Sequence, residues 1–287
     1  MKTYLDKNVY EAALERIAYC FQEFDNVLVA FSGGKDSGVL LNLCYNYADE
    51  HGLLDKLTMY HLDYEAQYQM TTEYVTRTFL EQFPGIRKMW YCVPIKAQSA
   101  CALGEPYWTP WDAAKKKLWV RAMPENPYVV HEGNLDVPFR HGMVDYEFQD
   151  KLSRHFAKKR GTTAVMVGLR ADESLNRYAA VARGKKRRSY EGRKWITQTS
   201  AVTANVYPLY DWRVSDIWTA TARFGFDYNR LYDLLYQAGL TAGQMRVASP
   251  FNDCAQESLK LYKVIDPSNW ARMIGRVNGV NFTGLYG

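Results

Sequence analysis

The chain is poor in cysteine, and its cysteines are not spaced as a redox or metal motif requires. Its 287 residues include five cysteines, an odd number, and no C-x-x-C pair. This argues against a disulfide framework and favours a reducing compartment. The five histidines form no His-x-x-x-His or Cys/His pattern, so no zinc site is predicted.

Long apolar runs are absent as well. No uninterrupted apolar stretch approaches the roughly 20 residues that a membrane-spanning helix needs. Residues 1–6 carry no apolar leader segment. We therefore expect a cytoplasmic protein without membrane contact. The sequence also shows no helix–turn–helix, zinc-finger or RNA-recognition signature.

Positive charge is modest overall but locally concentrated. The formal net charge is +5, and seven cations fall within the twelve residues that begin with Arg183 and end with Lys194. Such a run can be a solvated loop, a lid over phosphates, or a contact for nucleic-acid backbone. Its position directly after residues 173–177, a candidate phosphate-binding segment, favours the lid.

Strand-like and helix-like segments alternate along most of the chain. Short apolar runs at 26–31, 57–62, 88–94 and 164–167 are typical of buried parallel strands. Amphipathic segments between them predict helices at 8–24, 37–49, 70–83 and 146–160. A hairpin or strand is expected at 195–206, with helices at 215–224, 229–238 and near 255–264. This alternation predicts an α/β fold with a parallel sheet flanked by helices.

Residues 95–145 interrupt this rhythm. They are rich in proline and tryptophan, which predicts an insertion with little regular structure beyond a short helix at 112–121. We expect its tryptophans to form a small core of their own. The chain then divides into an α/β domain, residues 1–240, and a C-terminal extension, residues 241–287, that packs on it.

The strongest chemical signal is the turn that follows the first strand. Its residues are Ser32, Gly33, Gly34, Lys35, Asp36 and Ser37. Two glycines let backbone N–H groups approach a ligand, and the following helix adds the partial positive charge of its N-terminus. Lys35 can meet phosphate oxygens. Asp36 would repel phosphate unless it holds Mg²⁺, so it is the candidate metal ligand. The pattern is not a Walker A motif.

This turn resembles the PP-loop of the N-type ATP pyrophosphatase superfamily. Within it, the chain is similar to the phosphoadenosine phosphosulfate (PAPS) reductase family. Two further segments carry the resemblance: 168–174 with Arg177, which is similar to a Gly-x-Arg…Glu-Ser…Arg motif, and 207–212, which is similar to a Pro-Leu-x-x-Trp segment.

The resemblance implies a mostly parallel, five-stranded, Rossmann-like sheet of the adenine nucleotide alpha hydrolase type. An adenine nucleotide, ATP or PAPS, would lie over the carboxyl ends of the strands. Carried over by position, Lys35, Asp36 and Arg170 would be catalytic, and Asp63 would lie near the ribose or metal. The nucleotide and its phosphates would be held by Ser32, Gly33, Gly34, Lys35, Ser37, Asp63, Gly168, Arg170, Glu173 and Arg177.

The chain departs from the family at its C-terminal part. PAPS reductases carry a Glu-Cys-Gly-Leu-His motif there, and this chain has neither that motif nor the paired cysteines of related iron–sulfur enzymes. Thiol-dependent reduction is therefore in doubt, and no iron–sulfur cluster is expected. Cys254 is the one cysteine of the last third that could substitute. Segments 107–112, 118–124 and 238–246 resemble a branch described as PAPS sulfotransferases or prophage co-activators, which implies a ParB-like protein partner.

Three functions stay open on this reading. The first is an enzyme that cleaves ATP at the α-phosphate and adenylylates an acceptor. The second is PAPS-dependent transfer or reduction of a sulfonate group. The third is a nucleotide sensor without catalysis that acts through a protein partner.

Overall fold

A mostly parallel sheet forms the centre of the fold. The computed structural model describes residues 6–182 and 189–282. In this part of the chain the sheet has eight strands in the order β6-β3-β2-β1-β7-β10-β9-β8. The strands are β1 (Asn26–Ala30), β2 (Leu57–Leu62), β3 (Arg87–Cys92), β6 (Val129–His131), β7 (Thr163–Val167), β8 (Ser189–Tyr190), β9 (Arg193–Gln198) and β10 (Thr203–Val206).

The α/β prediction is confirmed, and the sheet is larger than the five strands expected. Strands β3, β2, β1, β7 and β10 are parallel neighbours and make up the expected centre. Beyond it, β6 adds a parallel strand next to β3, while β9 and β8 continue the other edge in antiparallel order. The three-residue β6 lies inside the insertion, where it is too short to show a period of two in the sequence.

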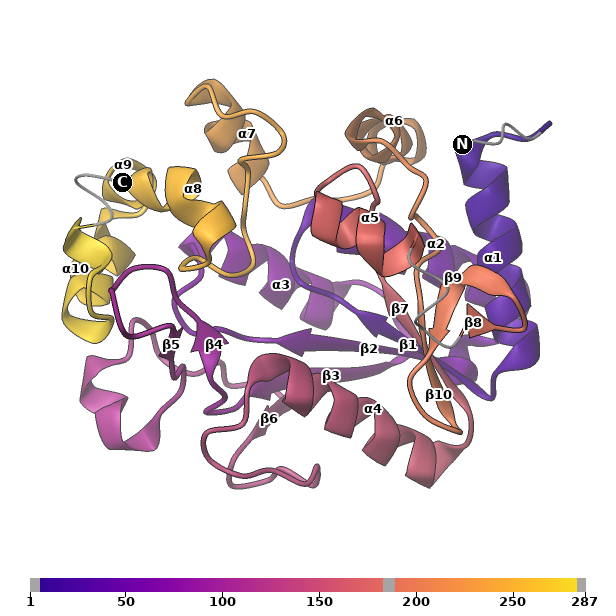
Figure 1. The fold of residues 1–287 in the computed structure, drawn as a ribbon, viewed down its shortest axis with the longest axis horizontal. Coiled ribbons are helices and arrows are strands. Elements are labelled where there is room, and N and C mark those ends of the chain that lie inside the picture. Colours follow the sequence, from indigo (N-terminus) through magenta and orange to yellow (C-terminus); the bar gives the residue numbers. More distant parts are fainter. Residues whose placement is uncertain (1–5, 183–188, 283–287) are drawn as a thin grey trace.

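Helices cover both faces of this sheet, as Figure 1 shows. On β1, Val27 and Val29 point to one face and Leu28 to the other, as strand geometry requires. The first face packs against α1 (Val9–Glu23), α2 (Lys35–Glu50), α3 (Gln69–Glu81) and α6 (Val214–Phe224), and the second against α4 (Asp145–Arg160). These five helices agree with the sequence prediction. No helix in the described ranges is long and apolar enough to cross a membrane.

The remaining elements are shorter. They are the two-stranded hairpin of β4 (Ala97–Gln98) and β5 (Tyr107–Trp108), the 3₁₀ turns η1 (Leu54–Lys56), η2 (Ala113–Leu118) and η3 (Asp253–Ala255), and helices α5 (Leu175–Ala182), α7 (Leu231–Gln237), α8 (Gln256–Lys260), α9 (Tyr262–Ile265) and α10 (Pro267–Arg276). The expected helix at 112–121 is therefore a 3₁₀ segment. Helix α10 was not predicted, although its start is marked: Asp266 caps the helix and Pro267 is its first residue.

The insertion does not have a core of its own, contrary to expectation. Trp111 belongs to the core of the main sheet, and its indole Nε1 donates to the carbonyl of Asp63 at 2.9 Å. Trp108 packs edge-to-face on Phe251 of the C-terminal region. A second apolar cluster joins the insertion, the segment after β2, α7 and the C-terminal helices. Figure 1 shows α8 to α10 beside the β4–β5 hairpin at one end of the molecule.

A buried carboxylate joins the segment after β2, the insertion and the C-terminal helix α10. Glu65, after β2, is fully buried and lies in the left-handed region at φ 61°. Its two oxygens accept from Arg276 of α10 at 2.8 and 3.0 Å. They also accept from the backbone N–H groups of Trp111 and Val120 in the insertion, at 2.6 and 3.0 Å. The insertion and the C-terminal segment are thereby fixed to the edge of the sheet where β2 ends.

We predict that Glu65→Gln destabilises the protein by about 3 kcal/mol, because it leaves the buried guanidinium of Arg276 without its counter-charge. Urea unfolding measures the change. Glu50→Gln, at the exposed end of α2, is the matched control and should change stability by about 0.5 kcal/mol or less. Equal effects of the two substitutions would show that Glu65 does not anchor these regions.

Candidate functional site

The predicted loop lies where the theory of open α/β sheets places a ligand. Residues 32–37 follow β1 at the carboxyl edge of the parallel strands and lead into α2. Beside them is a cavity of about 150 Å³. It is lined by five residues of the loop, by Gly168, Glu173 and Arg177 after β7, by Tyr232 of α7, and by six residues between 245 and 252. A wider groove of about 420 Å³ runs along α3 and holds none of the predicted residues.

Glycines allow the loop its tight course. Gly33 has φ +77°, and a Cβ there would lie 3.0 Å from Val75 of α3. Gly168, at the end of β7, lies against the loop itself: a Cβ on it would be 2.9 Å from the backbone of Asp36 and Ser37. Position 33 therefore needs glycine for its left-handed backbone, and position 168 needs it for the close approach of the two backbones. The predicted Gly168 thus supports the loop from the neighbouring strand.

Hydroxyl groups accept from the N–H groups of the loop. Ser32 N–H donates to the Ser37 hydroxyl at 3.1 Å, and Gly34 N–H donates to the Ser32 hydroxyl at 3.3 Å. The N–H of Lys35, in the first turn of α2, donates to the phenol oxygen of Tyr232 at 3.2 Å. A phosphate oxygen is the kind of acceptor that such groups bind.

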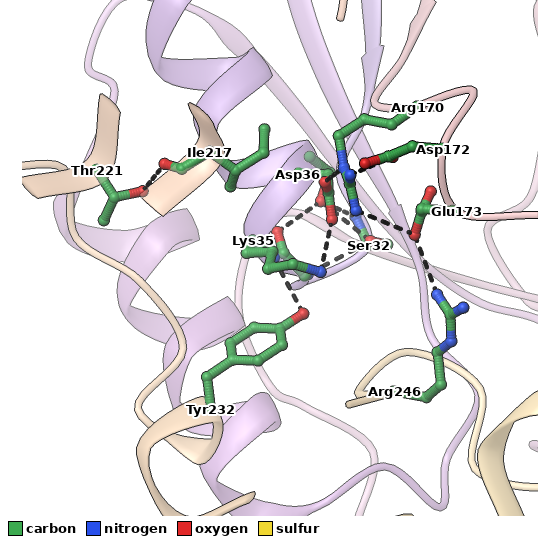
Figure 2. A network of polar contacts seen from close by, with 12 residues as sticks. Ser32, Lys35, Asp36, Arg170, Asp172, Glu173, Ile217, Thr221, Tyr232 and Arg246 are labelled. Carbon is green, nitrogen blue, oxygen red and sulfur yellow. Dashed lines mark hydrogen bonds and ion pairs between the residues drawn. The ribbon is translucent and has the colours of Figure 1, made fainter. Parts of the chain in front are cut away.

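Charged side chains form a continuous network beside the cavity, shown in Figure 2, although two of its members, Arg170 and Asp172, do not line the cavity. The buried Lys35 ammonium lies 3.0 Å from the Asp36 carboxylate, which also accepts from Arg170. Arg170 pairs in addition with Asp172 and approaches Glu173 at 3.9 Å. The network thus joins the loop after β1 to the segment after β7.

Glu173 extends the network to the C-terminal region. Its carboxylate pairs with Arg177 and accepts from Arg246 Nη1 at 3.1 Å. Among the described residues the network contains four cations (Lys35, Arg170, Arg177 and Arg246) and three carboxylates (Asp36, Asp172 and Glu173), so four minus three leaves one positive charge. An anionic ligand would be attracted to this surface.

The network determines the protonation of Asp36. Burial alone would raise the pKa of its carboxyl, but the adjacent Lys35 and Arg170 outweigh burial and hold that pKa below its ordinary value. Asp36 is therefore ionised and already faces two cations. In the part of the chain that the structure describes, no group of three or more His, Cys, Asp or Glu side chains could hold a metal ion. Asp36 as a ligand of Mg²⁺ stays a prediction.

Asp63 does not line the cavity, although it was predicted to lie near the ribose or metal. Its fully buried carboxylate accepts from Arg121 at 2.5 Å and from the indole of Trp90 at 2.7 Å. Burial alone would raise the pKa of Asp63, but Arg121 and His61 outweigh it and hold the pKa below its ordinary value. In this structure Asp63 fixes the insertion to β2, and its contact with a ribose stays untested.

Two other predictions fall largely outside the described residues. Residues 183–188 of the basic segment lie outside the described ranges. Arg193 and Lys194 belong to β9, and Arg193 pairs with Glu191 at 2.7 Å. The lid and nucleic-acid readings stay predictions. The side chain of Cys254 also lies outside the described part.

Sequence reasoning did not find Tyr232 or Arg246. Tyr232 lies on a helix whose apolar pattern resembles any core-facing helix, and Arg246 is an isolated cation in an irregular segment. No local pattern marks either residue, because their contacts with the loop and with Glu173 cross 197 and 73 residues of chain.

Residues 26–238 match the family model described as "Phosphoadenosine phosphosulfate reductase domain", and residues 239–287 match a domain of unknown function, DUF3440. The chain is 35% identical over 285 residues to "Uncharacterized protein YbdN" of Escherichia coli (strain K12). The aligned region covers 98% of this chain and 68% of YbdN.

Solved structures with a related arrangement share little sequence. A phosphoadenylyl-sulfate (PAPS) reductase from Candida auris, in a phosphate complex, is 14% identical with a TM-score of 0.45, covering 86% of this chain and 97% of its own. An NH₃-dependent NAD synthetase from Campylobacter jejuni is 10% identical with a TM-score of 0.36, covering 97% of each chain. At these identities the likeness concerns the fold alone.

We predict that Asp36→Asn destabilises the protein by about 3 kcal/mol at pH 7, because Lys35 and Arg170 lose their shared counter-charge. A carboxyl with a depressed folded pKa stabilises the fold above its unfolded pKa, about 3.9, and that contribution is lost as the pH falls through the folded pKa. The difference between variant and wild type in urea unfolding should therefore shrink below about pH 4. The exposed Asp55→Asn is the control; a penalty for Asp36→Asn that does not change with pH would contradict the assignment.

Proposed function

Because the chain belongs to the phosphoadenosine phosphosulfate reductase family, we propose that its cavity binds the phosphates of an adenine nucleotide and that ATP is cleaved there at the α-phosphate. The family match covers residues 26–238, which include the loop, Arg170, Glu173 and Arg177. In the reaction, an acceptor nucleophile forms a bond to the α-phosphorus. The bond from that phosphorus to the bridging oxygen breaks, and pyrophosphate leaves with the electron pair.

The observation that carries this proposal is the position of Lys35. Its ammonium is buried on the cavity wall at the first turn of α2, beside a network with an excess of positive charge. Fixed cations and helix N-terminal N–H groups stabilise charge that develops on a leaving pyrophosphate. Lys35 would supply this stabilisation, Arg170 would hold Asp36 in place beside it, and the serines would shape the loop. The remaining residues orient the nucleotide relative to the acceptor.

The size of the cavity agrees with phosphate binding. Sites for drug-sized ligands measure about 300–1,000 Å³, and the cavity beside the loop measures about 150 Å³. It is therefore suited to the phosphates, while the adenosine would extend beyond it. Mg²⁺ would arrive with the nucleotide and neutralise phosphate charge, since it is commonly held by substrate phosphates with one or two carboxylates.

Sulfonate transfer or reduction with PAPS is the second candidate, and family membership favours it. Reduction needs a thiolate that attacks sulfur. None of Cys20, Cys44, Cys92 and Cys101 lines the cavity, and burial raises the pKa of the first three thiols above the ordinary value. Such thiols are poor nucleophiles. Nucleotidyl transfer needs no thiol, so the described residues suit it better, and Cys254 is the cysteine on which the alternative rests.

We predict that ATP–Mg²⁺ raises the thermal midpoint of the wild-type protein and that Lys35→Ala abolishes this shift. At a hundred times its Kd the ligand should stabilise the fold by about 2.7 kcal/mol. Lys158→Ala, which removes an exposed lysine of α4, is the control and should keep the shift. Pyrophosphate release, followed with candidate acceptors, then tests cleavage.

The same experiment separates the alternatives. Stabilisation by PAPS and not by ATP–Mg²⁺ would favour sulfonate chemistry. Tight nucleotide binding without pyrophosphate release, with or without a protein partner, would favour a nucleotide sensor. If Lys35→Ala responds to ATP–Mg²⁺ like the wild type, the loop is not the phosphate site.

A further inference from the structure

The cavity wall that faces the loop comes from the C-terminal region. Met245, Arg246, Val247, Ala248, Ser249 and Asn252 line it. All six lie within residues 239–287, which match a domain of unknown function and not the PAPS reductase model. Figure 2 shows Arg246 extending from this segment toward Glu173, on the side of the network away from Lys35.

Two polar atoms on this wall have no partner. Arg246 Nε and Asn252 Oδ1 are buried and make no hydrogen bond within the described part of the protein. A buried polar group without a partner costs about 1–3 kcal/mol, and native proteins keep few of them without a reason. Both atoms belong to residues lining the same cavity, so one ligand could satisfy both.

The chemistry of the two atoms defines that ligand. Arg246 Nε is a donor that requires an acceptor, and its guanidinium already uses Nη1 on Glu173. Because a guanidinium has five N–H donors, Arg246 can bind an anion and still keep this bond. Asn252 Oδ1 is an acceptor that requires a hydroxyl or amino donor. A nucleotide carries an anionic group and such donors together.

Charge points to a second anionic group. Glu173 is the only carboxylate in the described network that Arg246 pairs with, and it is shared with Arg177 and, at 3.9 Å, with Arg170. Arg170 has Asp36 and Asp172 as further partners, so Glu173 is left as the one carboxylate for two guanidinium groups, those of Arg177 and Arg246. Lys35 and the loop form one centre of positive charge, and Arg177 and Arg246 form another within the same cavity lining. A ligand with two linked phosphates can contact both.

We infer that Arg246 binds the second anionic group of the ligand and that Asn252 accepts a hydrogen bond from a hydroxyl or amino group of the same molecule. The C-terminal segment is then the wall that distinguishes a nucleoside polyphosphate from a monophosphate. This inference rests on the proposed phosphate-binding role of the loop. It assigns a specificity-determining residue to a segment outside the PAPS reductase match.

The test compares the affinities of the full chain for ATP–Mg²⁺, AMP and inorganic pyrophosphate by isothermal titration calorimetry. Arg246→Gln should weaken binding of ATP–Mg²⁺ and pyrophosphate about tenfold or more, as expected for a lost hydrogen bond to a charged group. It should leave the affinity for AMP within about twofold, because the loop alone holds a single phosphate. Arg246→Lys keeps the charge without the Nε donor and should show an intermediate loss.

Two further variants sharpen the result. Arg272→Gln makes the same change at an exposed position of α10 outside the cavity, and it should bind all three ligands like the wild type. Asn252→Leu removes the acceptor at similar side-chain volume. It should lower the affinity for ATP–Mg²⁺ and AMP more than the affinity for pyrophosphate. Thermal midpoints without ligand show whether each variant is folded.

The outcomes are distinguishable from those of the proposed function. If Arg246→Gln and Arg246→Lys bind ATP–Mg²⁺ and pyrophosphate like the wild type, the role of Arg246 is overturned while the loop assignment stands. If the wild type binds pyrophosphate but no adenine nucleotide, the proposed function is overturned, and pyrophosphate affinity alone decides on Arg246. If the wild type binds none of the three ligands, both proposals are overturned.

Discussion

The candidate site depends on the ion pair between Asp36 and Arg170. Asp36 lies in the turn after β1, and Arg170 follows β7, so the pair joins two neighbouring strands at their carboxyl edge. Gly168 makes this possible, because the loop backbone passes where a Cβ would lie. Lys35 is then held against the other oxygen of Asp36. With this pair in place, the cationic groups converge on one small cavity without first having to be ordered by a ligand.

The part of the site that could be predicted is the part encoded locally. The turn at residues 32–37 lies between an apolar strand and a helix, and Gly168, Arg170, Glu173 and Arg177 lie within ten residues of each other. Such short patterns carry their own geometry, since glycine spacing and a strand end fix where side chains can point. The parallel sheet followed from the same kind of reasoning, because alternating strands and helices admit few arrangements.

The remainder could not be predicted because it depends on contacts between distant segments. Tyr232 and Arg246 reach the site only through packing of α7 and the C-terminal region on the insertion. Asp63 shows the converse: its place after β2 suggested a ligand contact, but Arg121 of the insertion pairs with it instead. Strand β6 was missed for a simpler reason, since three residues carry no readable period.

Glu65 also bears on how the protein can be divided. The two family matches meet between residues 238 and 239, and a fragment that ended there would keep every described strand of the sheet. It would nevertheless lose Arg276, the counter-ion of a fully buried carboxylate, and with it the wall formed by residues 245–252. We therefore expect a fragment that ends at the boundary between the sequence families to be less stable than the full chain. Joining the first segment to another C-terminal segment would require a new cation to neutralise Glu65, and joining the second to another sheet would require a new carboxylate for Arg276.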